Sequence, residues 1–522
     1  LKDQKVDQTL TINQQDAQSD VENIINTNKN IFTKSDNPLN YLHEESKFID
    51  FNRDRLLDHM LSTEGPKLAL GDVNKDGYTD VFIGGSKGKS SMLYLGTKNG
   101  FKLGNNKVFS ENAITEDTAS VFFDADNDGD LDLYVCSGGV EFSQFSPNYY
   151  DHLYFNNGKG DFTLSDQKLP ILNDYKSTST VKTADIDGDG DLDLFVGERS
   201  IAGKYGASCS GFILENDGNG IFKDITASKA PQLTNIGMIT DALFEDLNND
   251  KLPDLIIIGE FMNVEFFENK SGRFEKVAAN DLDTEKGWWN VIKAADLDND
   301  GDLDLIIGNH GLNSRFKATQ EHPIKLYVKD FDQNGYSDPI LTFNVSENKD
   351  FPFALRHDLI DQIKSLKKKF PNYESFQNAS IQDMFGPDGL NDITPLEVNT
   401  LETILLINEG NFKFKKHKLP IKAQLSPIYA IEAFDFDGDN DIDILMGGNL
   451  FSVKPQVGRY DASYGVYLEN KGNLEFKTYQ ENLGFTIFGE IRDIKLDPIK
   501  EQFYVTRNND SLATFKFKHN EK

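Results

Sequence analysis

The chain has 522 residues, of which 38% are hydrophobic and 27% are charged, and its formal net charge is −31. This acidic balance argues against nucleic acid as a partner, because neutralising phosphates requires clustered Lys and Arg. No apolar run approaches the ~20 residues of a membrane-spanning helix, so no membrane-spanning segment is expected. The length allows a large hydrophobic core.

Residues 1–44 are predicted to form an N-terminal extension, and residues 45–522 a single repeat domain. The apolar run Phe48-Ile49-Asp50-Phe51 is the predicted first strand of that domain. We expect it to pair with residues 512–515, because a ring of sheets closes when the two chain ends share one sheet.

An aspartate-rich nine-residue pattern, D-x-[DN]-x-[DN]-[GNK]-x-x-D, then recurs seven times between apolar runs. Oxygens at positions 1, 3 and 5 of a tight loop converge on one point, as a hard cation such as Ca²⁺ requires. Position 6 needs a sharp turn, position 7 would offer its backbone carbonyl, and the aspartate at position 9 would close the cage. The predicted metal-binding residues are Asp72, Asn74, Asp76 and Asp80; Asp124, Asp126, Asp128, Asp130 and Asp132; Asp185, Asp187, Asp189, Asp191 and Asp193; Asp246, Asn248, Asp250 and Asp254; Asp296, Asp298, Asp300, Asp302 and Asp304; Asp330, Asp332, Asn334, Tyr336 and Asp338; and Asp435, Asp437, Asp439, Asp441 and Asp443.

The residues after these loops distinguish them from EF-hands, which place Glu at position 12 and a helix on each side. Strand-forming runs such as Leu133-Tyr134-Val135 follow instead, so the loops are expected to join the strands of hairpins. Hairpin turns alone could explain runs of Asp, Asn and Gly. Seven copies with acids at constant offsets favour Ca²⁺, with five to seven ions, and the copy at Asp246 is the weakest because Lys251 and Pro253 lie in its turn.

Most copies start about 50 to 60 residues apart, which is the length of one four-stranded propeller blade. A second hairpin follows each loop, with Asn157-Gly158 or Asp217-Gly218 at its tip. Counting a decayed copy at Asp493, the sequence predicts an all-β propeller of seven blades, with the calcium loops between strands 1 and 2.

The Asp330 copy follows the Asp296 copy too closely to begin a blade, so we expect it inside blade five. A helical insertion is predicted near residues 345–400, where Leu359, Ile363, Leu366 and Phe370 recur at helical spacing. This apolar stripe must be buried on the propeller or on a partner. If the insertion builds a blade, the number of blades is eight.

Only two cysteines occur, Cys136 and Cys209, so a disulfide framework is excluded; they are expected as buried thiols or as one pair. The sequence starts at Leu1 without a signal peptide, as in a processed or trimmed chain. Because Ca²⁺ is abundant outside cells, we expect an exported protein, extracellular or on an outer-membrane surface.

The loops resemble FG-GAP/VCBS repeats, the family that includes the integrin α-subunit propeller, and Phe82-Ile83-Gly84-Gly85 resembles the strand that follows its loops. Residues 64–69, 308–315 and 458–465 are similar to the C-terminal propeller of Bacteroidetes repeat proteins that carry an ASPIC/UnbV domain. Residues 8–12 look like the end of such a domain, in which case the chain is a fragment of a larger protein. The resemblance implies a calcium-stabilised surface module and no particular ligand.

The propeller end opposite the calcium loops carries long connections, where binding residues are usual. The candidate ligand-binding residues there are Trp288, Arg315, Arg459 and Tyr460, which propeller geometry directs toward a common funnel. An aromatic wall with guanidinium groups suits an acidic ligand. Alternatively, the arginines neutralise Asp461 or join blades.

Two functions remain open. The first is a non-catalytic calcium-binding module, such as the propeller of a surface lipoprotein, whose partner is a protein or a glycan at the cell surface; an outer-membrane transporter complex is one candidate. The second is an extracellular carbohydrate-active enzyme, a lyase or a glycosidase, although the eight His residues show no H-E-x-x-H spacing.

Overall fold

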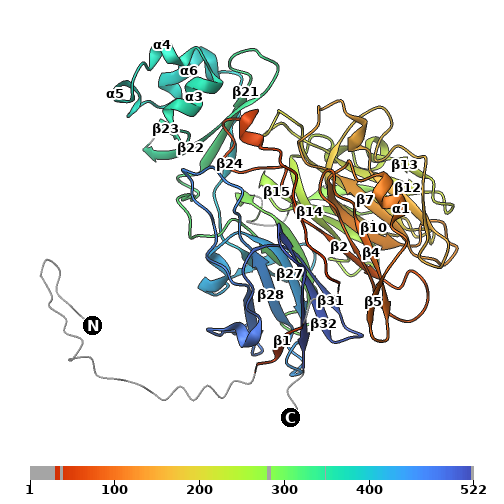
Figure 1. Cartoon of the computed structure of the whole chain (residues 1–522). Coiled ribbons are helices and arrows are strands. Elements are labelled where there is room, and N and C mark those ends of the chain that lie inside the picture. The colour runs from red at the N-terminus through yellow and green to blue at the C-terminus, as the bar shows by residue number, and fades with distance from the viewer. Residues whose placement is uncertain (1–29, 36–38, 279–281, 283, 347–348, 519–522) are drawn as a thin grey trace, which may run out of the picture. The chain divides into compact units, whose positions relative to one another are not determined.

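Seven four-stranded antiparallel sheets follow one another along the computed structural model, which describes residues 30–35, 39–278, 282, 284–346 and 349–518 (Figure 1). Blade one contains β2 (Leu68–Gly71), β3 (Asp80–Ile83), β4 (Met92–Thr97) and β5 (Gly100–Leu103). Blade two contains β6 (Asp117–Phe123), β7 (Asp132–Ser137), β8 (His152–Asn156) and β9 (Phe162–Leu164). Blade three contains β10 (Ser177–Ala184), β11 (Asp193–Ser200), β12 (Gly211–Asn216) and β13 (Phe222–Asp224). Blade four contains β14 (Met238–Glu245), β15 (Asp254–Met262), β16 (Glu265–Asn269) and β17 (Phe274–Val277), with β18 (Gly287–Trp288) paired to β15.

The remaining blades have the same strand order, but the chain leaves blade five between its second and third strands, and the last strand of blade seven comes from the start of the chain. Blade five contains β19 (Val291–Ala295), β20 (Asp304–Gly308), β25 (Ile404–Asn408) and β26 (Phe414–His417). Blade six contains β27 (Ile428–Phe434), β28 (Asp443–Gly448), β29 (Val466–Asn470) and β30 (Phe476–Thr478). Blade seven contains β31 (Glu490–Asp497), β32 (Gln502–Asn508) and β33 (Ala513–Phe517), and β1 (Phe32–Ser35) completes it.

The first strands of the seven blades form a closed ring. Each of β2, β6, β10, β14, β19, β27 and β31 contacts the next first strand, and β31 contacts β2. Such closure leaves only short sheet edges exposed. The predicted seven-bladed β-propeller is therefore confirmed.

Strand β1 closes the ring by pairing with β33, with Phe32 opposite Phe517 and Lys34 opposite Phe515. The prediction that residues 48–51 supply this strand is wrong, because a short 3-10 helix spans Asp50–Asn52. Phe32 packs edge-on against Phe436, Tyr467 and Phe503, whereas Ile49 is 49% exposed. The compact propeller unit begins at Ile31, so residues 31–44 belong to it and not to the predicted extension.

An additional four-stranded sheet and four helices are inserted into blade five between β20 and β25 (Figure 1, green to teal). The sheet contains β21 (Ile324–Lys329), β22 (Asp338–Ser346), β23 (Lys349–Pro352) and β24 (Leu396–Val398). The helices are α3 (Arg356–Gln362), α4 (Leu366–Lys369), α5 (Tyr373–Phe376) and α6 (Ile381–Leu390). The insertion therefore starts before residue 345, and it is not an eighth blade, because its strands lie outside the ring of first strands.

The predicted apolar stripe of the insertion is buried within the insertion itself. Leu359, Ile363, Leu366 and Phe370 share a core with Tyr327 and Ile340 of the inserted sheet and with Leu56. Two short helices, not one continuous helix, carry the stripe. None of the helices in the described residues is long and apolar enough to cross a membrane.

A bulge recurs near the start of five first strands. The pairing register skips one residue in β6, β10, β14, β27 and β31. The skipped residues all line the central channel: Thr118, Ser179, Thr240, Tyr429 and Arg492. A bulge re-aims a side chain in this way. The hydroxyls of the first three bond the next blade, with Thr118 donating to the carbonyl of Thr178 at 2.7 Å.

The predicted decayed loop at Asp493 is wrong, because Asp493 lies inside β31. Its carboxylate accepts a hydrogen bond from the backbone N–H of Leu68 in blade one at 3.0 Å. It therefore joins the last blade to the first and is not a metal ligand. Cys136 and Cys209 are both buried free thiols.

Residues 39–66, here called the crossing segment, run over the channel mouth at the end opposite the strand 1–2 loops. Backbone bonds join His43 to Asp510 in blade seven and Met60 to Ser452 in blade six. Arg53 donates to the carbonyl of Val140 in blade two at 2.8 Å. The segment therefore links blades that are not neighbours in sequence.

Three partly or fully buried glutamates lie where the crossing segment meets blade two. Burial, together with the neighbouring Glu141 carboxylate, raises the pKa of Glu45 to about 8, and burial raises the pKa of Glu141 to about 7. Burial and both neighbours raise the pKa of Glu116 well above its usual range. Glu45 Oε1 accepts from the N–H of Gly65, whereas Oε2 has no hydrogen-bond partner within the part of the chain that the structure describes.

In blades two, three, four and six, an asparagine at the end of the third strand joins the blade to the preceding one. In blade three the Asn216 amide donates to the carbonyl of Ala125 in blade two at 2.9 Å and to Leu192 at 3.2 Å. Asn156, Asn269 and Asn470 make the same bond to the preceding blade. These amides satisfy carbonyls that water cannot reach.

Asn216→Ala should lower the free energy of unfolding by roughly 2 kcal/mol, because it leaves two carbonyls without their donors. Urea unfolding measures this change. The control is Asn219→Ala, since Asn219 is exposed at the tip of the same hairpin and its amide donates only to Asp217. Equal stability of the two variants would contradict the role given to Asn216.

The three glutamates predict a loss of stability at alkaline pH. A carboxyl whose pKa is raised by folding stabilises the protein fully below its unfolded pKa of about 4.3, and this contribution is lost as pH rises through the folded value. At saturating Ca²⁺, the free energy of unfolding of the wild type should therefore fall between pH 5 and pH 8.5. The same fall should be smaller in Glu45→Gln. Glu111→Gln, at an exposed glutamate, should match the wild type; a Glu45→Gln profile as steep as the wild type would contradict the assignment.

Candidate functional site

Six of the seven aspartate loops join the first and second strands of blades one to six, as the sequence predicts. They occupy residues 72–80, 124–132, 185–193, 246–254, 296–304 and 435–443. The loop at residues 330–338 instead joins β21 and β22 of the insertion, so its placement in blade five is wrong. Ser337 donates to the carbonyl of Gly203, in the connection between β11 and β12. This loop therefore lies at the opposite end of the propeller from the other six.

Two residues of each loop adopt the left-handed backbone conformation. At position 6, φ is 83° at Gly129 and 95° at Gly301, and Lys251 and Asn440 adopt it without being glycine. This confirms the predicted sharp turn. Position 4 is left-handed as well, for example at Asn127 with φ of 59°. Asparagine tolerates this region better than most residues, which is why Asn and Gly recur at position 4.

Backbone N–H groups hold the loop carboxylates in place. In the blade-two loop, Asp124 Oδ2 accepts from Gly129 at 2.9 Å. Asp132 at position 9 accepts from Ala125 through Oδ2 at 2.9 Å and from Asn156, in the third strand, through Oδ1 at 2.7 Å. Position 9 therefore fixes the loop, the second strand and the third strand to one another, and equivalent pairs occur in blades one, three, four, five and six.

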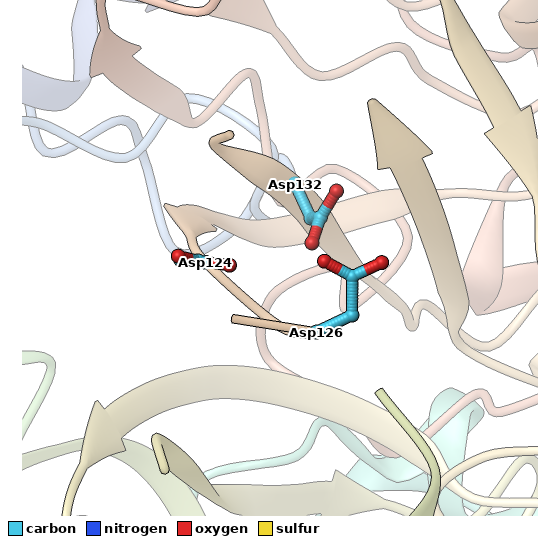
Figure 2. Close-up of side chains that lie close together, drawn as sticks. All are labelled: Asp124, Asp126 and Asp132. Carbon is cyan, nitrogen blue, oxygen red and sulfur yellow. The ribbon is translucent and has the colours of Figure 1, made fainter. Parts of the chain in front are cut away.

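Five loops bring at least three carboxylates together closely enough to hold a metal ion. In each, one oxygen per residue lies within 4.8 Å of the others. The groups are Asp124, Asp126 and Asp132; Asp185, Asp187 and Asp193; Asp296, Asp298 and Asp300; Asp330, Asp332 and Asp338; and Asp435, Asp437 and Asp443. Figure 2 shows Asp126 and Asp132 facing each other, with Asp124 beside them. The loops at Asp72 and Asp246 have Asn at position 3 and so offer fewer carboxylates.

Three loop oxygens are buried without a hydrogen-bond partner among the described residues: Oδ1 of Asp124, Asp298 and Asp332. A buried carboxylate oxygen normally has a partner, so these atoms fit a cation as their missing partner. The acidic groups could therefore hold metal ions.

Burial and mutual repulsion both disfavour the charged form of these carboxylates. Burial, with a smaller contribution from the neighbouring Asp126 and Asp128, raises the pKa of Asp132 to about 7. Burial raises the pKa of Asp443 to about 8, with Asp437 adding to the shift. A cation at the loop would favour the charged form again.

Position 4 also carries a contact that the sequence analysis missed. Asn249 donates to the position-7 Asp302 of the next blade at 2.9 Å, and Asn299 donates to Asp441 at 2.7 Å. Asn127 donates to Asp191 in the same way. The position-7 side chains therefore link loops, which leaves their backbone carbonyls for a metal. The recurrence of Asn at position 4 was the available signal.

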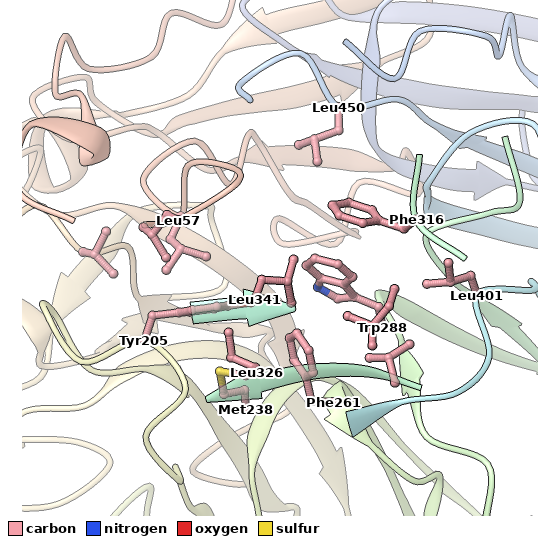
Figure 3. Packing of buried hydrophobic residues seen from close by; sticks show 14 of the residues in the cluster. Leu57, Tyr205, Met238, Phe261, Trp288, Phe316, Leu326, Leu341, Leu401 and Leu450 are labelled. Carbon is pink, nitrogen blue, oxygen red and sulfur yellow. The ribbon is translucent and has the colours of Figure 1, made fainter. Parts of the chain in front are cut away.

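The candidate ligand residues at the opposite end differ in exposure. Trp288 is 4% and Tyr460 is 7% exposed, and both belong to one hydrophobic core (Figure 3). The His310 ring joins them, stacked on Trp288 at 5.2 Å and edge-on to Tyr460 at 4.6 Å between ring centroids. The prediction that they form an accessible funnel wall is wrong, because the crossing segment and the insertion cover them through Leu57 and Leu341.

Of the two candidate arginines, Arg315 fastens the insertion to the propeller. Its guanidinium lies 4.8 Å from the ring centroid of Phe353 and donates to the Phe353 carbonyl at 3.2 Å. Arg459 lies 5.2 Å from the ring centroid of Phe451. Both are exposed. The structure therefore separates the four residues into a buried pair, a connecting arginine and a surface arginine.

The channel mouth holds a buried polar cluster that the sequence did not identify. Arg199 pairs with Glu260 at 2.5 Å and with Glu64 of the crossing segment. His59 Nδ1 lies 3.2 Å from Asp58 Oδ1, and His59 is 4% exposed. The cavity beside this cluster has a volume of about 40 Å³. This cavity is therefore large enough for only a few water molecules.

A comparison with protein families agrees with the repeat pattern of the loops. An FG-GAP-like repeat model matches residues 72–135, 142–196 and 246–307. No curated protein sequence shows significant similarity to the chain. Among solved structures, Sqt1 of Saccharomyces cerevisiae has a TM-score of 0.41 and 12% identity, over 90% of this chain and 98% of that chain. YCF48 from Cyanidioschyzon merolae has a TM-score of 0.40 and 10% identity, over 88% and 98% of the two chains. Likeness at this level says nothing about activity. The resemblance to ASPIC/UnbV proteins is not confirmed, and residues 8–12, on which it partly depends, lie outside the described residues. The chain contains FG-GAP-like repeats, and it folds as a seven-bladed β-propeller.

Proposed function

We propose that this propeller is a non-catalytic binding module that takes up five to seven Ca²⁺ ions in its aspartate loops. The loops would hold the ions through positions 1, 3, 5 and 9 and the carbonyl of position 7. Calcium prefers six to eight oxygen ligands, and every donor of these loops is a carboxylate, an amide oxygen or a carbonyl. When bound, Ca²⁺ would neutralise the clustered carboxylates and so stabilise the hairpins between strands 1 and 2.

The observation that carries this proposal is the buried, unpartnered Oδ1 of Asp124, Asp298 and Asp332 within groups of converging carboxylates. A hairpin turn without a bound ion does not require such an unpartnered carboxylate oxygen. A turn needs the hydrogen bonds from backbone N–H groups, which these loops already have, and would leave no reason to bury a further carboxylate oxygen.

The proposal places the protein outside the cell or on an outer-membrane surface, as an exported protein or lipoprotein. Extracellular modules bind calcium with a Kd of about 10⁻⁴ to 10⁻³ M, which external Ca²⁺ saturates and cytosolic Ca²⁺ does not. The expected partner is a protein or a glycan at the cell surface, with an outer-membrane transporter complex as one candidate. FG-GAP propellers generally mediate binding, which supports this role.

The channel mouth supports binding over catalysis. The cavity at the channel mouth has a volume of about 40 Å³, and its charged or basic lining residues are His59, Glu64, Lys67, Arg199 and Arg492. Pockets that bind small molecules have volumes of about 300 to 1,000 Å³. The crossing segment leaves no room there for a sugar substrate, so a carbohydrate-active enzyme is the less favoured alternative.

Chelation should destabilise the protein. A ligand present at about 100 times its Kd stabilises the folded state by about 2.7 kcal/mol per independent site, and several sites are expected here. Excess EDTA should therefore lower Tm by several degrees or more, and added Ca²⁺ should restore it. Scanning calorimetry measures the shift; an unchanged Tm after metal loss confirmed by elemental analysis would refute the proposal.

Asp187→Ala should lower Tm in Ca²⁺ and reduce the shift caused by EDTA, because it removes one of three converging ligands. Asp166→Ala is the matched control, since Asp166 is exposed in the neighbouring blade and outside any loop. If both variants keep the wild-type EDTA shift, the loop at residues 185–193 does not bind calcium.

A further inference from the structure

Three aromatic rings and one arginine form a continuous strip at the propeller end opposite the six calcium loops. Phe451, Arg459 and Tyr464 come from the connection between β28 and β29, and Phe488 comes from the connection between β30 and β31. Ring centroids are 5.6 Å apart for Phe451 and Phe488 and 5.5 Å apart for Phe488 and Tyr464. The Arg459 guanidinium lies 5.2 Å from the Phe451 centroid. The order along the strip is therefore arginine, phenylalanine, phenylalanine, tyrosine.

Three members of the strip are exposed to solvent, and Phe451 is half-buried. Tyr464 is 54% and Phe488 is 47% exposed, and Arg459 is exposed as well. Adjacent planes are inclined by 32° and 39°, so the rings present a gently curved surface and not a closed stack. Contiguous aromatic surface of this kind is unusual on a protein face without a binding role.

Arg459 is an uncompensated cation on this strip. Among the described residues it makes no ion pair and no side-chain hydrogen bond, although Asp461 is two residues away. Neighbouring arginines are paired: Arg492 with Glu490 at 2.9 Å and Arg507 with Asp510 at 2.6 Å. The earlier alternative that Arg459 neutralises Asp461 therefore does not hold, and its planar fork is available for an anion.

We propose that this strip binds a carboxylated polysaccharide, with pyranose rings lying on Phe451, Phe488 and Tyr464 and a carboxylate on Arg459. The inference rests on the proposed binding role of the propeller and names its ligand class. Aromatic faces stack on the C–H faces of sugars, and a guanidinium donates two parallel hydrogen bonds to a carboxylate. The regular spacing of the rings fits a ligand made of repeated planar units.

An acidic peptide is the competing occupant, and the strip fits it less well. Peptide anchors are side chains that fill well-packed, desolvated pockets. Here the rings lie in a row, and Arg459 is the one cation in the strip, on a chain of net charge −31. Charge alone would therefore hold an acidic peptide weakly, whereas ring stacking adds to the affinity for a sugar chain.

The test is affinity gel electrophoresis of the full chain in Ca²⁺, with polygalacturonate, the neutral glucan pullulan or poly-glutamate cast into the gel. Polygalacturonate should retard the wild type. Arg459→Ala and Phe488→Ala should each raise the apparent dissociation constant for polygalacturonate about tenfold. This is the size expected for loss of a charge-assisted hydrogen bond or of an aromatic contact. Tyr464→Ala should raise this constant as well, which keeps the test valid if Phe488→Ala fails to fold.

Matched controls separate the strip from general surface effects. Phe145→Ala removes a phenylalanine that is 72% exposed in another blade, and Arg273→Ala removes an exposed arginine that pairs with Glu275. Both should bind like the wild type. Retardation by pullulan or poly-glutamate equal to that by polygalacturonate, unchanged retardation of Arg459→Ala, or no retardation at all would each overturn the inference. Because Tm with and without EDTA is measured on the same samples, loss of this inference is distinguishable from loss of the calcium proposal.

Discussion

The buried carboxylate at position 9 of each repeat is the interaction on which the propeller depends. In blade two, Asp132 bonds the loop through Ala125 and the third strand through Asn156. Asn156 then reaches the carbonyl of Val73 in blade one at 2.7 Å. One side chain thus connects the loop, its own sheet and, through its partner, the preceding sheet. Burying a carboxylate for this purpose is costly unless its charge is compensated. The converging aspartates supply a place for the compensating cation.

The same arrangement explains how the two ends of the propeller differ. At one end, six loops share a backbone conformation and are linked by contacts such as Asn249 to Asp302, so this end is uniform and fixed. At the other end, connections vary in length, and the crossing segment and the insertion close the channel mouth. The proposed binding surface at this end is therefore on the rim, where Arg459 and Tyr464 are exposed. A rigid scaffold with variable loops at one end is a common basis for binding.

The repeated features of the fold could be predicted from the sequence, because each repeat has the same residue types at the same offsets. The left-handed turn at Gly129 and the hairpins of the first six blades follow from that pattern. The seventh blade was counted correctly, but from a supposed loop at Asp493 that is in fact part of strand β31. The closing strand was missed because β1 is a four-residue strand with one fully buried phenylalanine, Phe32, and nothing in so short a run separates it from the more apolar run at Phe48. Its position is set by packing in blade seven, which is a long-range effect.

The sites outside the repeat were harder to predict for a related reason. Asp330 carries the loop pattern, and the pattern is locally correct, but the sheet it belongs to is an insertion that only long-range pairing reveals. Trp288 and Tyr460 fit a surface role by position, yet a covering segment from elsewhere in the chain buries them. The strip combines Phe451 and Tyr464 from one connection with Phe488 from another, so no single stretch of sequence predicts it.

The central claim is that the aspartate loops hold calcium, and anomalous scattering from crystals grown with Ca²⁺ tests it most directly. The account predicts anomalous peaks inside the loops at Asp124, Asp185, Asp296, Asp330 and Asp435, each about 2.3 to 2.6 Å from the carboxylate oxygens. Weaker or absent peaks at Asp72 and Asp246 would agree with the smaller number of carboxylates there. Loops with the same geometry but only water between Asp124, Asp126 and Asp132 would contradict it.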